Sequence, residues 1–223
     1  MTASEAQAAN KTEAQTPTRH GWAVRSPLAI GLFLMVCATA LAGDLLSKHV
    51  VFSSFLNRPE CAAEVQAIRL AYRSQLDRDP DATEILHLFQ RDVVPGVKFT
   101  LSTNPGVVFG MEMPRWAMLA AHGAAVLMIA VFFAASERRA WSVHLSLALI
   151  LAGALGNFYD RLYSSVQLPG YEPIINQVRD FVDCSQMGYV WIFNLADAWL
   201  VIGVGILMLH CLFAGRKSHV GRK

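Results

Sequence analysis

Residues 140–161 read AWSVHLSLALILAGALGNFYDR and combine a long apolar run with an abrupt polar end. The first 20 positions, 140–159, carry no charged side chain. A helix that crosses a bilayer needs roughly 17–25 apolar residues. Three further uncharged stretches, of 18, 21 and 18 residues, lie at 26–43, 116–136 and 198–215. The sequence therefore predicts four transmembrane helices. An ordinary soluble globule is excluded, because only 16% of the residues are charged against about 25% in an average soluble domain.

Lysine and arginine residues flank the predicted spans unevenly. They precede the first span, lie between the second and third, and follow the fourth: Lys11, Arg19, Arg25, Arg138, Arg139, Arg216, Lys217, Arg222 and Lys223. Cytoplasmic loops carry such an excess of positive charge, whereas loops longer than about 60 residues cross largely regardless of charge. We therefore expect both termini and the 136–140 loop on the cytoplasmic side.

The expected organisation is one four-span unit with two external inserts and two tails. Residues 1–25 are expected to be a disordered cytoplasmic tail, because they are rich in Ala, Thr and Gln and lack apolar periodicity. The spans are expected at about 26–50, 115–136, 140–161 and 193–215, the inserts at 53–113 and 162–192, and a basic cytoplasmic tail at 216–223.

The first insert contains two kinds of predicted element. Apolar residues recur at helical spacing over 62–89 and are interrupted by Pro80, which predicts two short amphipathic helices. Residues 93–102, VVPGVKFTLS, predict a strand hairpin around the Pro-Gly pair. The second insert, 162–192, contains two prolines and is expected to be mostly loop.

Two alternatives stay open at this stage. Residues 28–41 could be the core of a cleaved signal peptide, with 40–43 as a small-residue cleavage site. The apolar run continues beyond Asp44, however, which favours a retained helix. Cys61 and Cys184 both fall in external segments, where oxidation can occur, but the distance between them cannot be read from sequence.

The predicted spans carry their unusual polar residues at the same end. In chain order these residues are Asp44, Asn157, Asp160, Arg161, Asn194 and Asp197, and Asn104 and Gly106 just precede the second span on the same side. Because the spans alternate in direction, all of these positions reach the outer leaflet, and ionisable groups within a span are by default candidates for function. The alternative is that they are interfacial anchors, with Asp44 paired to Lys48 and Asp160 paired to Arg161.

Two aspartates, Asp180 and Asp197, suggest acid–base hydrolysis. Two carboxylates close together near a low-dielectric boundary cannot both ionise, so one keeps a proton while the other activates a shared water. That water would attack a peptide carbonyl whose oxygen is protonated by the acid. A Ser47–Lys48 pair fits worse, because adjacent residues do not face each other on a helix. No spacing of Cys, His, Asp and Glu in the sequence resembles a metal site.

Five blocks, spread in order over all four spans, are similar to the lipoprotein signal peptidase (signal peptidase II) family. They read DLLSK at 44–48, NPGVVFG at 104–110, GNFYDR at 156–161, VRDF at 178–181 and FNLADA at 193–198. The resemblance implies an all-α membrane protein, with four transmembrane helices, a small external β-cradle and, in this chain, short amphipathic external helices. It also implies a bacterial inner-membrane location with the active site on the periplasmic side.

The same resemblance implies an aspartic endopeptidase that removes the signal peptide from diacylglyceryl-modified bacterial prolipoproteins and cleaves before the lipidated cysteine. By position, Asp180 and Asp197 correspond to the catalytic pair. The residues expected to bind substrate or support the site are Asp44, Lys48, Asn104, Gly106, Asn157, Asp160, Arg161 and Asn194. The expected partners are prolipoproteins, membrane lipids and globomycin-type inhibitors, and neither a nucleic acid nor a cofactor or metal is expected.

The chain departs from the family pattern in three ways. Both inserts are longer than usual, and the second leaves Asp183 as a rival to Asp180 for the catalytic role. Asp180 is preferred because Phe181 completes its block. Val108 replaces the usual small alanine, which would narrow the lip of the pocket.

The rival class of function is a four-span membrane protein without enzymatic activity, such as a small transporter or an assembly scaffold. A transporter is expected to carry polar groups at the bilayer midplane, whereas here they cluster at the outer end only. A pore-forming oligomer needs a polar stripe along a span, and none of the four spans has one.

Overall fold

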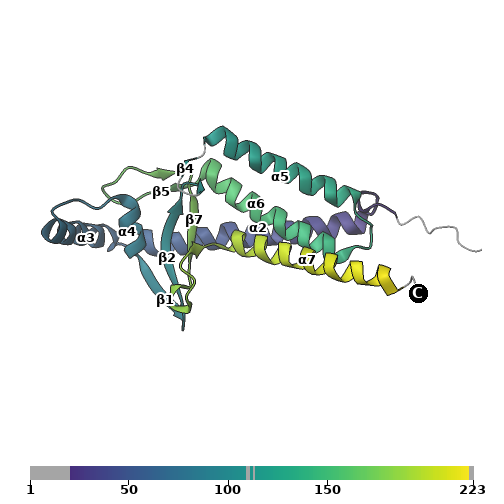
Figure 1. The fold of residues 1–223 in the computed structure, drawn as a ribbon. Helices are drawn as coiled ribbons and strands as arrows, with labels where there is room; N and C mark the ends of the chain where they lie inside the picture. The colour runs from purple at the N-terminus through teal and green to yellow at the C-terminus, as the bar shows by residue number, and fades with distance from the viewer. Residues whose placement is uncertain (1–20, 109–110, 113, 221–223) are drawn as a thin grey trace, which may run out of the picture.

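The computed structural model describes residues 21–108, 111–112 and 114–220 (Figure 1). The elements in chain order are η1 (Ala23–Arg25), α2 (Pro27–Leu56), α3 (Cys61–Leu76), α4 (Ala82–Leu88), β1 (Gln90–Val94), β2 (Val97–Asn104), β3 (Val107–Val108), β4 (Met111–Glu112), α5 (Arg115–Ala135), α6 (Trp141–Tyr163), β5 (Ser165–Val166), β6 (Ile174–Ile175), β7 (Val178–Asp183), η2 (Ser185–Met187), β8 (Ile192–Phe193) and α7 (Leu195–Val220).

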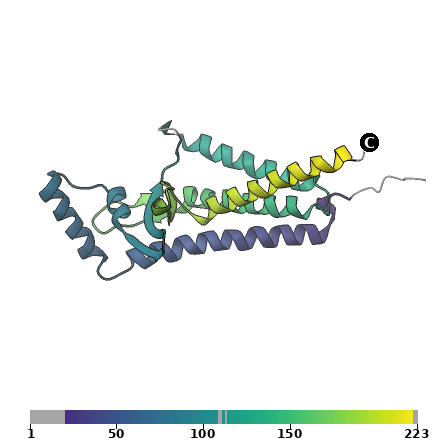
Figure 2. The ribbon, with the colours of Figure 1, turned by 60° about the horizontal axis from the view of Figure 1, so that its bottom comes forward.

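The helices α2, α5, α6 and α7 form an elongated bundle with a small sheet at one end (Figures 1 and 2). All four are long and apolar enough to cross a membrane, which confirms the predicted four-helix membrane fold. Successive helices run in opposite directions, so α2 begins and α7 ends at the end of the bundle far from the sheet. The ends of α2 and α6 and the start of α7 therefore meet at the sheet.

Helix α6 is the central helix because it contacts α2, α5 and α7. In the most apolar 18-residue segment of α6, 44% of the residues are buried, against 11% in the corresponding segments of α5 and α7. Small residues permit this close packing. A Cβ atom at Gly153 would collide with the carbonyl oxygen of Ala196 on α7, and a Cβ atom at Gly156 would collide with the Asp44 carboxylate on α2.

The sheet at the end of the bundle is antiparallel, with strand order β1–β2–β7–β8. Strand β2 comes from the first insert, and β7 and β8 come from the second. The expectation that 162–192 is mostly loop is therefore wrong for its second half. The sequence VRDFVD gave no clear strand signal by itself, because its main pairing partner lies more than 70 residues earlier, with Ser102 opposite Asp180.

The sheet and the insert helices share an apolar core with the end of α2. Phe52 and Phe55 of α2 pack in one buried cluster with Leu86, Leu101 and Phe181. Helix α2 has 30 residues and is therefore about 45 Å long, so it extends beyond a hydrocarbon layer of about 30 Å. Its last turns therefore belong to the compact unit outside the bundle.

The predicted elements of the first insert are confirmed. Helices α3 and α4 occupy 61–76 and 82–88, with Pro80 in the break between them. Helix α4 begins with a capping box between Asp81 and Glu84. Strands β1 and β2 pair as a hairpin whose turn contains Gly96 at a φ of 87°.

Two further expectations concern the N-terminal tail and the external cysteines. Residues 1–20 of the expected disordered tail lie outside the described residues, but Trp22 pairs with Glu137 and Ala23 is buried. The described part of the expected tail, residues 21–25, is therefore folded rather than disordered. Cys61 and Cys184 are both free, so the structure contains no bridge between them.

Candidate active site

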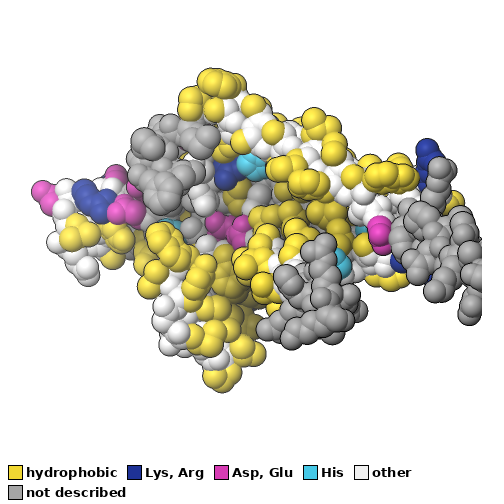
Figure 3. All heavy atoms as spheres, turned by 45° about the vertical axis from the view of Figure 1, so that its right-hand side comes forward, with side chains coloured by type: hydrophobic (Ala, Val, Ile, Leu, Met, Phe, Trp, Pro, Cys, Tyr) yellow, Lys and Arg dark blue, Asp and Glu magenta, His cyan; other side chains and the backbone are white. Residues whose placement is uncertain are grey.

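The predicted polar residues gather where three bundle helices meet β7. Asp44 and Lys48 come from α2, Asn157, Asp160 and Arg161 from α6, Asn194 and Asp197 from the start of α7, and Asp180 from β7. Figure 3 shows acidic side chains recessed in the middle of one face, between apolar surfaces. The fold therefore brings residues from four separate elements into one site.

Asp197 is held at the N-terminus of α7 by a reciprocal pair of hydrogen bonds. The Asn194 side-chain oxygen accepts from the Asp197 backbone N–H at 3.1 Å, and the Asp197 carboxylate accepts from the Asn194 backbone N–H at 3.3 Å. This arrangement is a capping box, and the helix N-terminus favours negative charge there. The other Asp197 oxygen accepts from the Asn157 amide at 2.8 Å.

The side-chain amide of Asn194 links the two predicted catalytic aspartates. Its nitrogen donates to Asp180 Oδ1 at 2.6 Å and to Asn157 Oδ1 at 3.1 Å. Asn194 is fully buried and Asp180 is 5% exposed. One buried amide thus bonds to Asp180 through its nitrogen, while the same residue caps the helix that carries Asp197.

The environment of Asp180 favours its protonated form. Burial, which has the largest effect, and the nearby charge of Asp197 outweigh the lowering effect of the Asn194 hydrogen bond and together raise the pKa of Asp180 to about 7. A carboxyl group with a pKa near neutrality can hold or release a proton under physiological conditions, as general acid–base chemistry requires.

A buried ion network lies behind the aspartates. The Lys48 ammonium lies 2.8 Å from Asp44 and 3.2 Å from Asp160, and all three side chains are fully buried. Lys48 also donates to Asn157 Oδ1 at 3.1 Å. The second Asp44 oxygen accepts from the backbone N–H of Ala196 at 2.9 Å. The network therefore orients Asn157, which in turn bonds to Asp197.

The ion pairs differ from those of the anchor alternative at one position. The Asp44–Lys48 pair forms as expected. Asp160, however, pairs with Lys48 and with Arg179, whose guanidinium lies 2.6 Å away. Among the described residues, Asp160 forms no ion pair with Arg161. Arg179 was not expected to contribute, because sequence spacing does not reveal which helix its strand lies against.

Arg161 lies beside the aspartates, and two of its nitrogen atoms have no hydrogen-bond partner among the described residues. Its Nε and Nη1 atoms are buried and unbonded within the part of the chain that the structure describes, and it is close enough to Asp180 and Asp197 to interact with their charges. Gly106, at a φ of 90°, lies against it, since a Cβ atom there would be 2.5 Å from Nη1. The exposed Asn104 accepts from the Gly106 N–H at 2.8 Å and shapes this loop, but it does not bond to the aspartates.

Asp183 has a different environment from Asp180. It accepts from the Thr100 hydroxyl and the Ser185 N–H, each at 2.9 Å, and lies 3.4 Å from Lys98. Burial opposes its ionisation, but the hydrogen bonds from Ser185 and Thr100 and the charge of Lys98 outweigh it and lower the pKa of Asp183 to about 2. The bonds of Asp183 thus tie β7 to β2, and this geometry favours Asp180 as the partner of Asp197.

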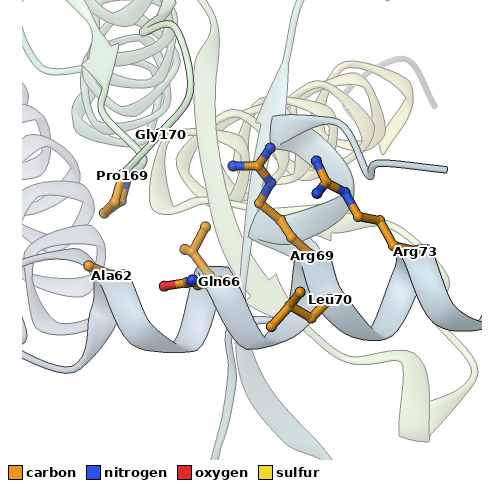
Figure 4. A pocket seen from close by; sticks show the side chains of 8 residues that line it. Ala62, Gln66, Arg69, Leu70, Arg73, Pro169 and Gly170 are labelled. Atoms are coloured by element: carbon orange, nitrogen blue, oxygen red, sulfur yellow. The ribbon is translucent and has the colours of Figure 1, made fainter.

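Two of the cavities in the described structure bear on the position of the site. A cavity of about 470 Å³ reaches Asp197 and is lined mostly by apolar side chains, namely those of Cys184, Tyr189, Phe193, Ala198, Val201 and Ile202. A second cavity of about 320 Å³ lies between α3 and the Pro169–Gly170 turn, with Arg69 and Arg73 on its wall (Figure 4). None of the predicted site residues lines the second cavity. Among the described residues, no group of three or more His, Cys, Asp or Glu side chains could hold a metal ion.

Comparisons with known proteins agree with this arrangement. The family described as signal peptidase (SPase) II matches residues 36–213. A protein called lipoprotein signal peptidase from Desulfitobacterium hafniense is 36% identical over 122 residues, which cover 53% of this chain and 71% of that protein. A protein of the same name from Teredinibacter turnerae is 36% identical over 149 residues, which cover 63% and 81%.

Solved structures are similar to this chain in fold. One, described as a bacterial membrane enzyme structure by the in meso method at 2.3 Å resolution, is 21% identical with a TM-score of 0.56. The match covers 87% of this chain and 93% of that one. A likeness at this identity supports the four-helix architecture with its sheet.

Proposed function

The chain belongs to the signal peptidase II family and is a multi-pass membrane peptidase of that family, and from this premise we propose its reaction. It removes the signal peptide from diacylglyceryl-modified prolipoproteins by cleaving before the lipidated cysteine. Asp180 and Asp197 carry out the hydrolysis. Names of relatives support the substrate class, since the similar proteins are called lipoprotein signal peptidases.

The observation that carries the mechanism is the link through Asn194, which bonds to Asp180 and caps the helix at Asp197. Asp197 receives hydrogen bonds from N–H donors on both oxygens, and such donors stabilise a carboxylate. Asp180 has a pKa of about 7. We therefore assign Asp197 as the base and Asp180 as the acid of the first step.

The reaction proceeds through a water held between the two carboxyl groups. Asp197 takes a proton from the water while the water oxygen bonds to the scissile carbonyl carbon. At the same time Asp180 gives its proton to the carbonyl oxygen. The tetrahedral intermediate then collapses. Asp197 returns its proton to the leaving nitrogen, and Asp180 recovers a proton from the gem-diol hydroxyl. The unpaired N–H groups of Arg161 are available to orient the substrate backbone.

The apolar cavity beside Asp197 supports a lipid-bearing substrate. Its wall on α7 contains Val201 and Ile202, which are 73% and 45% exposed and belong to a candidate membrane span. An apolar group that diffuses in the bilayer could thus reach the aspartates without leaving an apolar environment. Globomycin-type cyclic peptides are expected to compete for this site.

The orientation in the membrane is part of the same proposal. The site would face the periplasm, with both termini in the cytoplasm of a bacterial cell and the bundle in the inner membrane. Two observations support this orientation. Helix α2 begins and α7 ends at the end of the bundle away from the sheet (Figure 1), and the short segments that flank the spans at that end carry Arg25, Arg138 and Arg139.

A cleavage assay tests the proposal. Purified protein in nanodiscs is mixed with a diacylglyceryl-modified prolipoprotein, and Asp180→Asn, Asp183→Asn and Asp197→Asn are compared with the natural sequence. Asp180→Asn and Asp197→Asn should each lower kcat on the order of 10²–10⁴-fold, because each removes a proton-transfer group. Asp183→Asn is the matched control on the same strand and should keep its activity.

The possible outcomes separate the assignments. Loss of activity in Asp183→Asn and not in Asp180→Asn would keep the peptidase and move its acid. Failure of folded natural protein to cleave the lipidated substrate would overturn the proposed reaction and favour a four-span scaffold.

A further inference from the structure

We propose that Arg179 is a positioning residue for the reaction, and that its ion pair with Asp160 fixes strand β7, and with it Asp180, against helix α6. The inference rests on the proposed function, because it concerns the placement of the proposed acid. It assigns a role to a side chain that lies outside the set expected to form the site.

The contact between Arg179 and Asp160 is threefold. The Arg179 backbone N–H donates to Asp160 Oδ2 at 3.0 Å. Its guanidinium donates to Asp160 Oδ1 through Nε at 3.1 Å and Nη2 at 2.6 Å. The Asp160 side chain is fully buried and that of Arg179 is 13% exposed. Such charge-assisted, multiply bonded pairs have a fixed geometry.

This contact lies one residue from the proposed acid. Successive side chains on a strand point to opposite faces, so β7 can be held through Arg179 while it presents Asp180 toward Asn194. On its edges β7 pairs with β2 along most of its length and with β8 only at its end. The bond to Asp160 therefore supplies a direct link between β7 and helix α6 one residue from Asp180.

The pair also balances the charge of the buried network. Two cations, Lys48 and Arg179, face two anions, Asp44 and Asp160. Without the guanidinium this network would carry one net negative charge beside Asp180. The charged groups that act on Asp180 are Asp197 from α7, Lys48 from α2, and Asp160 and Arg161 from α6. Of these, the charges of Asp197 and, more weakly, Asp160 raise the pKa of Asp180, and the charge of Lys48 lowers it.

Geometry and charge can be separated by two substitutions. Arg179→Met removes both guanidinium bonds and the charge and leaves only the backbone N–H bond to Asp160, whereas Arg179→Lys keeps the charge but cannot make the forked contact. Because a misplacement of about 1 Å can cost on the order of 10²-fold in rate, kcat should fall about 10–100-fold in Arg179→Met. KM should change little, since Arg179 does not face the apolar cavity that we assign to the substrate.

The dependence of kcat on pH distinguishes a positioning role from a purely structural one, because a loss of stability alone would leave this pH profile unchanged. Asp180 acts as a proton donor, so activity falls as the pH rises through its pKa. Arg179→Met should shift this falling limb to higher pH, because the uncompensated charge of Asp160 favours the protonated Asp180. Arg179→Lys should keep the limb in place with an intermediate kcat. The matched control is Arg78→Met, which breaks an exposed bidentate pair with Glu84 on the first insert.

A second measurement needs no turnover. Infrared difference spectra follow the titration of the carboxyl band that is lost in Asp180→Asn, and its midpoint should be higher in Arg179→Met than in Arg78→Met or the natural protein. If the natural protein does not cleave but this midpoint moves, the proposed function fails, while the effect of the Arg179–Asp160 pair on Asp180 is upheld. An unchanged midpoint, or a fall in thermal stability with kcat and pH profile intact in the folded fraction, would overturn the inference.

Discussion

At the scale of single residues, the two acidic side chains of β7 that compete for one role have opposite environments. Both are buried, but Asp180 accepts a bond from the Asn194 amide and is affected by the charge of Asp197, whereas Asp183 accepts bonds from Thr100 and Ser185 and lies beside Lys98. The sequence predicted both positions as candidates but could not rank them by environment, because their partners come from β2, η2 and the start of α7. The block that contains Phe181 favoured Asp180 by resemblance, and the geometry favours it for a physical reason.

The opposite environments predict opposite effects on stability. The pKa of Asp180 rises from 3.8 to about 7, so the folded state prefers the protonated form. Stability from this group is fully present below about pH 3.8 and is lost as the pH rises toward 7. At alkaline pH the ionised group lowers the free energy of unfolding by on the order of 4 kcal/mol relative to acidic pH. Asp180→Asn should therefore raise Tm relative to the natural protein more at about pH 8 than at about pH 5.

Asp183→Asn provides the control for this measurement. The pKa of Asp183 falls to about 2, so its contribution is present above the unfolded value and is lost only as the pH falls toward 2. Asp183→Asn should lower Tm at both pH values. Thermal unfolding in detergent checks the pair, and an equal Tm difference at both pH values for Asp180→Asn would contradict the environment described for Asp180.

At the scale of elements, the helices were predictable because each is a long apolar run that needs no partner to be recognised. The hairpin β1–β2 was predictable from its own turn. Strand β7 was not, since its pairing with β2 joins two inserts that are separated by α5 and α6. The role of Arg179 was hidden for the same reason, because it depends on which helix β7 lies against.

Helix α6 gives an element-scale prediction through its glycines. Gly156→Ala would drive a methyl group into the Asp44 carboxylate, and overpacking of this kind costs about 1–3 kcal/mol. It should also displace α2 from α6 and so disturb Asn157 through Lys48, which lowers kcat. Gly123→Ala on α5 is the matched control, since no atom lies within 4 Å of its added Cβ.

Measurements of Tm and kcat for the two glycine variants test whether the close packing of α2 against α6 supports the site. The expected result is a loss of both in Gly156→Ala and of neither in Gly123→Ala. Natural Tm and activity in Gly156→Ala would show that α2 can move away from α6 without consequence for the site.

At the scale of the whole molecule, the proposed orientation predicts which surfaces a membrane-impermeant reagent reaches. Ser74 on α3 and Arg139 between α5 and α6 are both exposed, at opposite ends of the molecule. In intact cells, Ser74→Cys should gain labelling by an impermeant maleimide over the background of the natural cysteines. Arg139→Cys should gain labelling only after the cells are lysed. Labelling in the reverse pattern would invert the proposed topology.

The four-span architecture as a whole followed from composition, and the location of the site at one end followed from the alternation of span directions. The depth at which the site is buried did not follow from either. It depends on an ion network in which Lys48, Asp44 and Asp160 are all fully buried, and burial of charge arises only when the partners come together.

The length of α2 has a consequence for the physics of the surrounding bilayer. One rigid helix carries Asp44 and Lys48 and then continues into the apolar core beneath the sheet through Phe52 and Phe55. A bilayer that is thicker or thinner than the apolar part of this helix makes it tilt. Because the helix does not end at the membrane surface, a tilt displaces its outer end, which packs against the sheet that bears Asp180. We therefore expect the distance between Asp180 and Asp197 to depend on the thickness of the surrounding bilayer.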